Sequence, residues 1–467
     1  MTRRGLLAAA PGLVRAGSLR SKPHLVLFLA DDHGCHDSVV YSGVRDVRTP
    51  NLERLAGAGA VFRNTFSGAA ICQPSRAILS SGLCSHRNGC IANGRTMTPG
   101  IKTLPTYLKE LGYRVAHFGK GHYIPPENYR DWEAVKSEIP GANLTADLDT
   151  KAVDNWLGLH KDDGQPLCLM VNCHSPHVAW DQPSDYDPAK VTLPPSFIDT
   201  PETREVRTRY YADVTKMDHQ LGEVYDAVRR HLGGNTLFMT TSDNGAQWPF
   251  GKWNLYDAGI RLPMVAVWPG VIQPGSRSDA MLHFSDLLPT WMELAGGKAP
   301  SSLDGRSFAP VLLKGAGKHR DEIFASHTAD DNGHMNCYPM RALRTARYKY
   351  IRNLRPDLAY RTHIDRGVGR DGRQYWDAWR RMAARSAEAA TVVRRYHQRP
   401  AEELYDVSAD PHELKNLAGE KAVAGVMAGF RKRMDRVMGN MNDRGEVFGV
   451  PRPLGQGDEK DLLVFST

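Results

Sequence analysis

The chain has 467 residues, of which 41% are hydrophobic, 24% charged and 8% aromatic. This composition is typical of a folded globular protein and excludes a small disulfide scaffold, a collagen-like chain and a generally disordered one. No apolar stretch approaches the roughly 18 residues needed to cross a bilayer, and the net charge of +8 favours an anionic partner: nucleic acid, a membrane surface or an acidic substrate.

The first 20 residues carry Arg3 and Arg4 ahead of a short apolar stretch that Pro11 and Arg15 interrupt. This pattern favours a shortened twin-arginine export signal, with a disordered tail as the alternative. We therefore expect a periplasmic or secreted protein, or a cytoplasmic one if the segment is only a tail. The seven cysteines show no metal-ribbon spacing, and their spacing does not reveal whether any of them pair.

Short apolar runs predict strands, several of them buried on both faces, at residues 24–30, 114–118, 167–172, 236–241 and 264–268. Helical patterns lie between them. Thr49 and Pro50 open one helix as N-cap and first-turn proline. Another helix, over about 203–231, has an apolar stripe that includes Tyr210, Met217 and Leu221. Alternating strands and helices predict an α/β fold with a large, mostly parallel sheet wrapped by helices.

The pattern changes after about residue 320. Strands are expected at 344–351 and 403–407, and a last helix over about 411–438. We therefore divide the chain into residues 1–20, 21–320 and 321–467, the last with a small antiparallel sheet. Its segment 341–400 holds 16 Lys and Arg residues against 5 Asp and Glu.

Two polar clusters follow predicted strands. Asp31 and Asp32 come after the first strand, and Asp243 and Asn244 come after the strand at 236–241. Ligands of parallel sheets bind beyond the carboxyl ends of the strands. Clustered carboxylates repel one another unless a cation or a proton neutralises them, and all-oxygen ligation suits Ca²⁺ or Mg²⁺. The alternative is that each pair merely caps a helix or a turn.

A third cluster is the run from Cys72 to Arg76. Pro74 fits the first turn of a helix and Gly82 fits its end, which places Cys72 at a helix N-terminus beside a cation. Such surroundings lower the pKa of a thiol and mark a reactive position. The alternative is a small buried apolar residue.

This C-x-P-S-R run resembles the activation motif of the type I sulfatases, in which the cysteine is oxidised to formylglycine. The other clusters are similar to further motifs of that family, and the resemblance spans about residues 24–417. It implies an alkaline-phosphatase-like sandwich of helices around the sheet, with 21–320 as the catalytic domain and a smaller C-terminal α+β subdomain. It also implies a Ca²⁺ or Mg²⁺ site and a formylglycine-generating enzyme as the maturation partner.

The resemblance assigns roles residue by residue. It implies metal ligation by Asp31, Asp32, Cys72, Asp243 and Asn244, and catalytic roles for Cys72, Arg76, Lys120, His122, His177 and Lys252. Lys120 and Lys252 would hold the sulfate, and Arg76 would orient the hydrated aldehyde. His122 would accept a proton from that hydrate, and His177 with Lys252 would protonate the leaving group. Substrate-binding candidates are His174, His334 and Arg341.

Within the family, the chain looks most like the N-sulfoglucosamine sulfohydrolase (sulfamidase) group, notably at residues 254–256 and 338–341, the second of which resembles the edge of the sulfamidase pocket. It departs from that group between His86 and Pro105 and around residues 330–336. The expected activity is release of sulfate from N-sulfoglucosamine. The alternatives are an O-sulfatase, a phosphonate or phosphate monoester hydrolase of the same superfamily, and a glycan-binding protein without turnover.

The resemblance selects an acidic substrate rather than nucleic acid as the anionic partner. An arginine-rich helix expected over 373–396 contains Tyr375, Trp376, Trp379 and Tyr396. Aromatic faces beside guanidinium groups suit a sulfated sugar, so the segment is expected to form a glycan-contact surface, with a solvated helix as the alternative.

Overall fold

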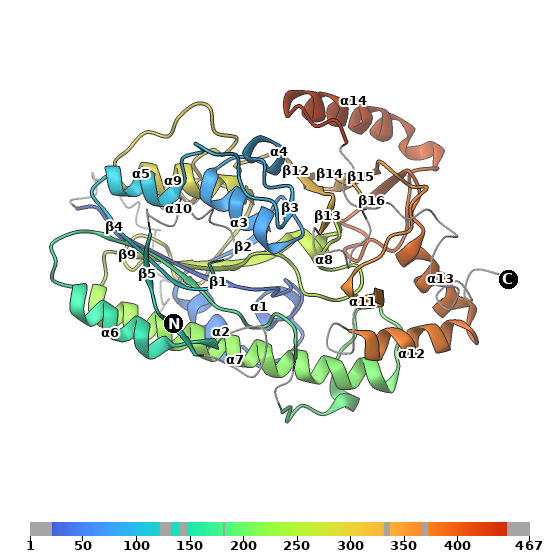
Figure 1. Ribbon diagram of the computed structural model, residues 1–467, viewed down its shortest axis with the longest axis horizontal. Helices are drawn as coiled ribbons and strands as arrows, with labels where there is room; N and C mark the ends of the chain where they lie inside the picture. Colours follow the sequence, from blue (N-terminus) through green and yellow to red (C-terminus); the bar gives the residue numbers. More distant parts are fainter. Residues whose placement is uncertain are drawn as a thin grey trace, which may run out of the picture.

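A computed structural model describes residues 21–121, 132–139, 147–180, 183–330, 337–366 and 372–445. Its centre is an eight-stranded sheet with the strand order β11-β2-β10-β9-β1-β8-β4-β5 (Figure 1). In that order, the strands are Ser276–His283, Ala60–Phe66, Arg261–Val267, Thr236–Ser242, His24–Ala30, Leu167–Asn172, Arg114–Gly119 and Glu133–Val135. Only β10 runs antiparallel to its neighbours. The predicted large, mostly parallel sheet is confirmed.

Strand β1 shows why the apolar runs form buried strands. Successive side chains point to opposite faces of a sheet. Leu25, Leu27 and Leu29 join the apolar cluster on one face, and Val26 and Phe28 join the cluster on the other. Burying such a side chain contributes about 1.5–3 kcal/mol, so a continuous apolar run is stable only between two layers of helices.

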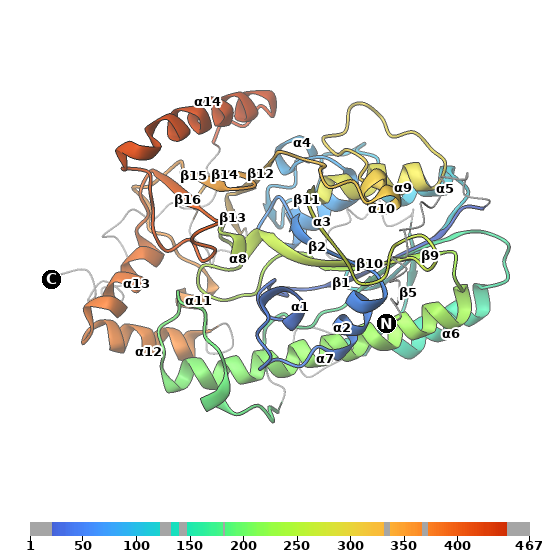
Figure 2. The same cartoon turned by 180° about the vertical axis from the view of Figure 1, so that it is seen from behind.

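Helices cover both faces of the sheet (Figures 1 and 2). One layer contains α1 (Val39–Ser42), α2 (Pro50–Ala58), α6 (Thr150–His160) and α7 (Pro201–Leu232). The other contains α3 (Cys72–Ser81), α4 (Ser85–Asn88), α5 (Leu104–Glu110), α9 (Leu287–Leu294) and α10 (Ala309–Lys314). Shorter elements are α8 (Asp257–Ile260) and the 3₁₀ turns Pro188–Lys190, Phe284–Asp286 and Lys421–Val423. The predicted stripe of α7 is buried, as expected.

The helix α2 begins at Pro50, as the sequence predicts, but the Thr49 side chain makes no capping hydrogen bond. The carboxylate of Asp218 on α7 caps it instead, because it accepts hydrogen bonds from the backbone N–H groups of Asn51 (2.9 Å) and Leu52 (2.8 Å). The unsatisfied N–H groups of the first turn are thus paired by a residue 167 positions away.

A second, antiparallel sheet has the order β12-β14-β15-β16, with bounds Glu322–His327, Met340–Thr345, Tyr348–Asn353 and Glu402–Asp406. Helix α14 (Ala424–Asn440) packs on it. Two-stranded pairs join β3 (Ala92–Asn93) to β13 (Ala329–Asp330) and β6 (Glu138–Ile139) to β7 (Asp147–Leu148). The smaller C-terminal α+β part is confirmed, while the boundary near residue 320 stays a prediction.

Three boundaries predicted for the C-terminal part are wrong. The strand expected at 344–351 is a hairpin, because the Thr345 hydroxyl bonds the backbone of Tyr348 and closes a tight turn. The helix expected at 373–396 is α12 (Arg373–Ala383) and α13 (Ala387–His397), because Ser386 caps a new helix by accepting from Ala389 N–H. The last helix starts at Ala424 rather than near 411.

The basic segment 341–400 does not present its aromatic residues as a glycan-contact surface. Tyr375, Trp376, Trp379 and Tyr396 are all buried, so this expectation is wrong. Helix α12 lies against one end of α7 (Figure 1), where the Trp379 indole donates to Thr203 (2.8 Å). The aromatic rings therefore belong to the core.

Several cations of this segment are buried as well, and they pair with acids from other parts of the chain. Lys349 binds Asp257 (2.5 Å) and Glu413 (2.9 Å), and Arg344 binds Asp257 (3.2 Å). Part of the local positive charge therefore joins the second sheet to α8.

All seven cysteines are free thiols and all are buried. Within the described ranges, we find no helix of the length and apolarity that a bilayer crossing requires. The export signal expected at residues 1–20 lies outside the described residues.

Candidate active site

Helix α3 places Cys72 at its first position. Ile71 precedes it in an extended conformation, and Gly82 ends the helix with φ 68°, a left-handed conformation that suits glycine. Arg76 lies one turn after Cys72, on the same face of the helix. The side chain of Gln73 binds Arg95 O (3.1 Å) and Gly94 N–H (2.8 Å), which holds this end of the helix against the loop after β3.

Four oxygen-bearing residues, named here the oxygen quartet, meet at the carboxyl ends of β1 and β9. They are Asp31, Asp32, Asp243 and Asn244. The two strands are parallel neighbours with Ala30 beside Ser242, so the pairs that follow them must lie side by side. Asp243 Oδ1 accepts from the Asp32 backbone N–H (3.1 Å), and the Asn244 side-chain amide donates to Asp32 Oδ1 (2.7 Å).

Three cations surround the quartet. Lys120 pairs with Asp31, Lys252 Nζ lies 2.7 Å from Asp32 Oδ2, and Arg76 Nε lies 2.7 Å from Asp243 Oδ2. Every one of these side chains is buried. The centre is therefore an ion-pair network shielded from water, where charges interact more strongly than at the surface.

The pKa values of Asp31 and Asp243 shift in opposite directions. Burial alone would raise the pKa of Asp31, but Lys120, His177 and Arg76 hold it well below its ordinary value. Burial and the negative charge of Asp31 raise the pKa of Asp243 to about 7. One carboxyl group of the quartet thus resists ionisation next to its neighbours, as expected of crowded carboxylates.

The residues present fit a hard divalent cation. Asp31 Oδ1 and Asn244 Oδ1 are buried without a hydrogen-bond partner among the described residues. Asp31, Asp32, Cys72 and His177 each offer a ligand atom, and these atoms lie within 4.8 Å of one another. Carboxylate and amide oxygens are the ligands that Ca²⁺ and Mg²⁺ prefer, so the quartet is suited to hold either ion.

The lowered thiol pKa expected for Cys72 is wrong. Burial raises its pKa to about 12, although Lys120 and Lys252 act to lower it. The position of Cys72 at the N-terminus of α3 does not offset the rise in its pKa that burial and the nearby carboxylates of Asp31 and Asp243 cause. The unmodified residue is a neutral thiol.

Two histidines of the segment after β8 face the quartet. His177 Nε2 lies 3.6 Å from Asp32 Oδ2, and His174 Nδ1 lies 3.9 Å from Asp31 Oδ2. His177 Nδ1 is 2.6 Å from Val178 O. Since a carbonyl only accepts, Nδ1 carries a proton, and Nε2 is the nitrogen that titrates. Burial and Lys252 lower the pKa of His177, and burial lowers that of His174 to about 3.

Three residues in the loops that follow β1 and β9 have left-handed backbones although none is a glycine: Asp32 (φ 65°), Phe250 (φ 67°) and Trp253 (φ 66°). Such conformations cost about 1–3 kcal/mol each and gather at functional sites. Trp253 N–H donates to Ala70 O (2.7 Å), and Lys252 N–H donates to Ala246 O (2.8 Å). Tertiary hydrogen bonds therefore hold the strained loop that presents Lys252.

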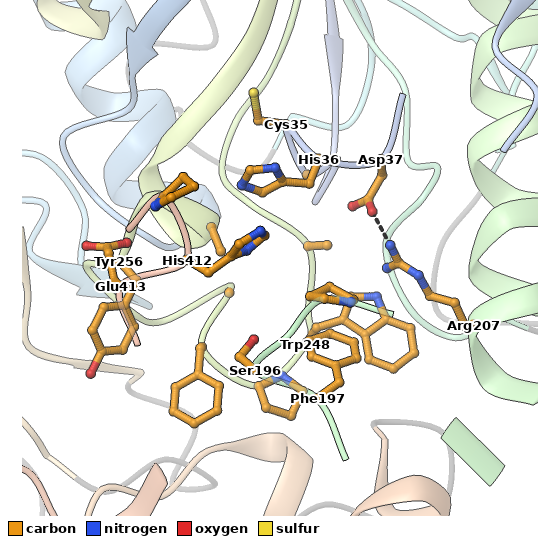
Figure 3. Close-up of a pocket in the computed structure, with 18 residues that line it drawn as sticks. Cys35, His36, Asp37, Ser196, Phe197, Arg207, Trp248, Tyr256, His412 and Glu413 are labelled. Carbon is orange, nitrogen blue, oxygen red and sulfur yellow. Dashed lines mark hydrogen bonds and ion pairs between the residues drawn. The ribbon is translucent and has the colours of Figure 1, made fainter. Parts of the chain in front are cut away.

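Figure 3 shows a pocket that the loops after Asp32 and Asn244 help to form. Residues 34–37, Ala246 and residues 248–251, which follow the two halves of the quartet, line it together with residues 411–413. His36 and His412 face each other with ring centroids 5.3 Å apart. Arg207 on α7 pairs with Asp37, whose carboxylate also accepts from the Tyr210 hydroxyl (2.8 Å). These contacts anchor the loop after Asp31 and Asp32 to the long helix.

The structure brings together most of the residues that the sequence singled out. Cys72, Arg76, Lys120, His177, Lys252 and the oxygen quartet form one centre, with His174 at its edge. His122 and His334 lie outside the described residues.

The predicted substrate contact of Arg341 is wrong. Its guanidinium is fully buried, and all five of its N–H groups are engaged. Nε and Nη2 bind Asp443, Nη1 binds the carbonyls of His327 (3.1 Å) and Met340 (2.8 Å), and Nη2 also meets His86 (3.0 Å). No donor is left for a substrate, so Arg341 is a structural anchor.

Sequence reasoning missed two buried residues beside Arg76. Asn172 ends β8 and His117 lies within β4, and both are hydrogen-bonded within the centre. A polar residue that ends an otherwise apolar strand run was the available signal for Asn172. His117 offers a similar signal, because it is a polar residue within the apolar run of β4.

The fold and the centre define a class: an α/β protein of alkaline-phosphatase-like architecture with a buried cluster of oxygen ligands surrounded by cations. A protein solved in complex with its substrate D-glucosamine-2-N,6-O-disulfate matches with a TM-score of 0.68 at 20% identity, covering 91% of this chain and 99% of that one. A phosphonate monoester hydrolase from Silicibacter pomeroyi matches with a TM-score of 0.67 at 19% identity, covering 93% and 100%. At these identities the likeness shows the fold.

The sulfatase family model matches residues 23–297, and the model for the C-terminal part of N-sulphoglucosamine sulphohydrolase matches residues 245–361. An ulvan-active sulfatase of Formosa agariphila is 33% identical over 410 residues, 87% of this chain and 78% of that protein. The N-sulphoglucosamine sulphohydrolase of Homo sapiens is 27% identical over 468 residues, 90% and 91% of the two chains. The chain belongs to the sulfatase family, whose members hydrolyse sulfate esters.

Proposed function

We propose that this protein removes sulfate from a sulfated sugar, with a formylglycine made from Cys72 as nucleophile and a divalent cation, Ca²⁺ or Mg²⁺, in the oxygen quartet. The observation that carries the proposal is that Cys72, the quartet and the cations Lys120 and Lys252 share one buried centre. The maturation partner is a formylglycine-generating enzyme, and export to the periplasm or the medium belongs to the same proposal.

The charges of the centre suit a sulfate group. Lys120 and Lys252 each contact a different carboxylate of the quartet, so their ammonium groups flank the place where the sulfuryl oxygens would lie. A bound divalent cation supplies Lewis-acid polarisation of a sulfuryl oxygen. Arg76 is fixed beside Asp243 (2.7 Å), on the helix that carries Cys72, and it orients the nucleophile.

His177 is placed to exchange a proton with the leaving group. Its Nδ1–H is held by Val178 O, which leaves Nε2 to exchange a proton with the leaving oxygen or nitrogen. Lys252 shares Asp32 with this imidazole and stabilises the negative charge that develops as the bond to sulfur breaks. His122, in the expected role of proton acceptor, completes the proposal.

N-sulfoglucosamine is the substrate that we propose first. It is supported by the matched C-terminal model and by the human relative, which aligns over nearly the whole length of both chains. Residues 338–341 do not support this choice, because Tyr338 and Arg341 are buried. An O-sulfated sugar such as an ulvan saccharide is the second candidate, since the ulvan-active relative is 33% identical.

Two measurements test the proposal. Mass spectrometry of the tryptic peptide 64–76 from protein made in its native host should show Cys72 as the aldehyde, while peptides with Cys84 and Cys90 remain thiols. Sulfate release is then measured on glucosamine N-sulfate, 6-O- and 2-O-sulfated sugars and ulvan oligosaccharides. A Cys72 that stays wholly a thiol overturns the nucleophile. Release from O-sulfated sugars alone overturns the N-linked choice and selects the second candidate.

A further inference from the structure

Asn172 is a buried amide placed between Arg76 and His117. It is the last residue of β8, where it lies beside Leu29 of β1 and Gly119 of β4. Its Oδ1 accepts from Arg76 Nη1 (3.0 Å), and its Nδ2 lies 2.7 Å from His117 Nε2. Asn172 and Arg76 are inaccessible to solvent, and His117 is nearly so.

The hydrogen-bond directions in this chain follow from the chemistry of its members. A guanidinium only donates, so Arg76 fixes the carbonyl end of the amide and turns the NH₂ group of Asn172 toward His117. At 2.7 Å a hydrogen must lie between the two nitrogens, and Asn172 supplies it. His117 Nε2 is therefore the acceptor, and its 3.1 Å contact with Lys120 O is not a hydrogen bond.

The neutral form of His117 that this arrangement requires is favoured by its surroundings. Burial and the positive charge of Arg76 together lower the pKa of His117 to about 4. The amide thus has a donor on one side and an acceptor on the other, and a flip would turn its NH₂ group toward the guanidinium of Arg76 and lose that hydrogen bond.

We propose that Asn172 is a positioning residue that fixes the guanidinium plane of Arg76 next to position 72; this inference rests on the proposed function. Arg76 is held at Nε by Asp243 and at Nη1 by Asn172. Asp243 belongs to the quartet and shares its charge with any bound cation. The Asn172 amide is neutral, and it lies on β8 with its NH₂ group bonded to His117 on β4. Asn172 is therefore the anchor whose hold on Arg76 does not depend on the cation.

The test uses the matured full-length protein with Asn172→Ala and Asn172→Asp. The alanine variant removes the acceptor for Arg76, and we expect kcat to fall about 10–100-fold, the effect typical of residues that support a catalytic group, with KM within about twofold. The aspartate variant keeps an oxygen facing Arg76, and we expect it to recover most of kcat. Asn353→Ala is the matched control, because Asn353 is also buried and hydrogen-bonded but lies in the second sheet.

A second readout does not depend on turnover. In ¹⁵N-arginine-labelled protein, the side-chain signals of Arg76, assigned as those missing in Arg76→Lys, should be sharp in the unmodified sequence and broadened in Asn172→Ala. Unchanged Arg76 signals overturn the inference. So does a kcat of Asn172→Ala equal to that of the unsubstituted protein or of Asn353→Ala. Failure of the unsubstituted, formylglycine-bearing protein to release sulfate would instead refute the proposed function, while the Arg76 signals still decide the inference.

Discussion

Replacing Arg341 by methionine separates a structural role for this residue from a substrate-binding one. Its side chain makes hydrogen bonds to both oxygens of Asp443 within a fully buried pair. Hydrogen bonds to charged groups contribute about 1.5–3 kcal/mol each, and removing one partner of a buried pair costs about 3–5 kcal/mol. We therefore expect Arg341→Met to lower the free energy of unfolding by about 3–5 kcal/mol, since Asp443 and the His327 carbonyl lose their donor.

The assay is urea unfolding at neutral pH, combined with kcat and KM below the unfolding transition. The double variant Arg341→Met/Asp443→Leu should regain at least half of the lost stability, because no lone charge is left buried. KM should stay within about twofold in the single variant, because Arg341 has no donor free for a substrate. A tenfold rise in KM with an unchanged unfolding midpoint would refute this reasoning and restore Arg341 as a substrate ligand.

The pair also predicts a pH dependence. Burial alone would raise the pKa of Asp443, but Arg341 and His86 hold it below its ordinary value. The stabilisation is therefore complete above the unfolded pKa of about 3.9 and is lost as the pH falls through the lower folded pKa. In Arg341→Met this acid-labile component should disappear.

Three further predictions concern the site and its surroundings. Adding Ca²⁺ to chelator-treated protein should raise its melting temperature, because the cation relieves repulsion within the oxygen quartet, and Asp243→Ala should abolish the rise in scanning fluorimetry. Lys252→Met should lower kcat about 10²–10³-fold, as loss of an electrostatic contact to the transition state does, whereas the exposed Lys314→Met should not. Burial and two nearby guanidinium groups lower the pKa of His327 to about 3, so stability should fall as the pH drops from about 6.5 toward 3; His327→Gln should flatten this slope, and an equal slope in both proteins would contradict the assignment.

The fold could be predicted where a pattern repeated over several residues determines it, and not where one side chain does. Strands such as β1 and β8 are apolar at every position because both faces are buried, and that pattern is visible in the chain itself. The hairpin at Thr345 and the break at Ser386 depend on single hydroxyl groups, each of which redirects a backbone that the apolar pattern would have continued.

The same contrast holds in the site. The quartet could be placed because it follows two strands, and parallel strands end at the same edge of a sheet. The partner of Arg341 is 102 residues away and could not be read from its neighbours. The aromatic residues of α12 have the composition of a sugar platform, but only their packing shows that they belong to the core.

The amino-acid sequence by itself determined the α/β class, the C-x-P-S-R run at Cys72 and the two acidic pairs, because each depends on residues adjacent in the chain. The tertiary structure decided which charged residues face the centre and which form ion pairs in other parts of the fold. It also buried Cys72, which raises the pKa of its thiol, and it placed Asn172 between Arg76 and His117. Burial and charge pairing arise between elements distant in the chain, and they depend on distances that only folding creates.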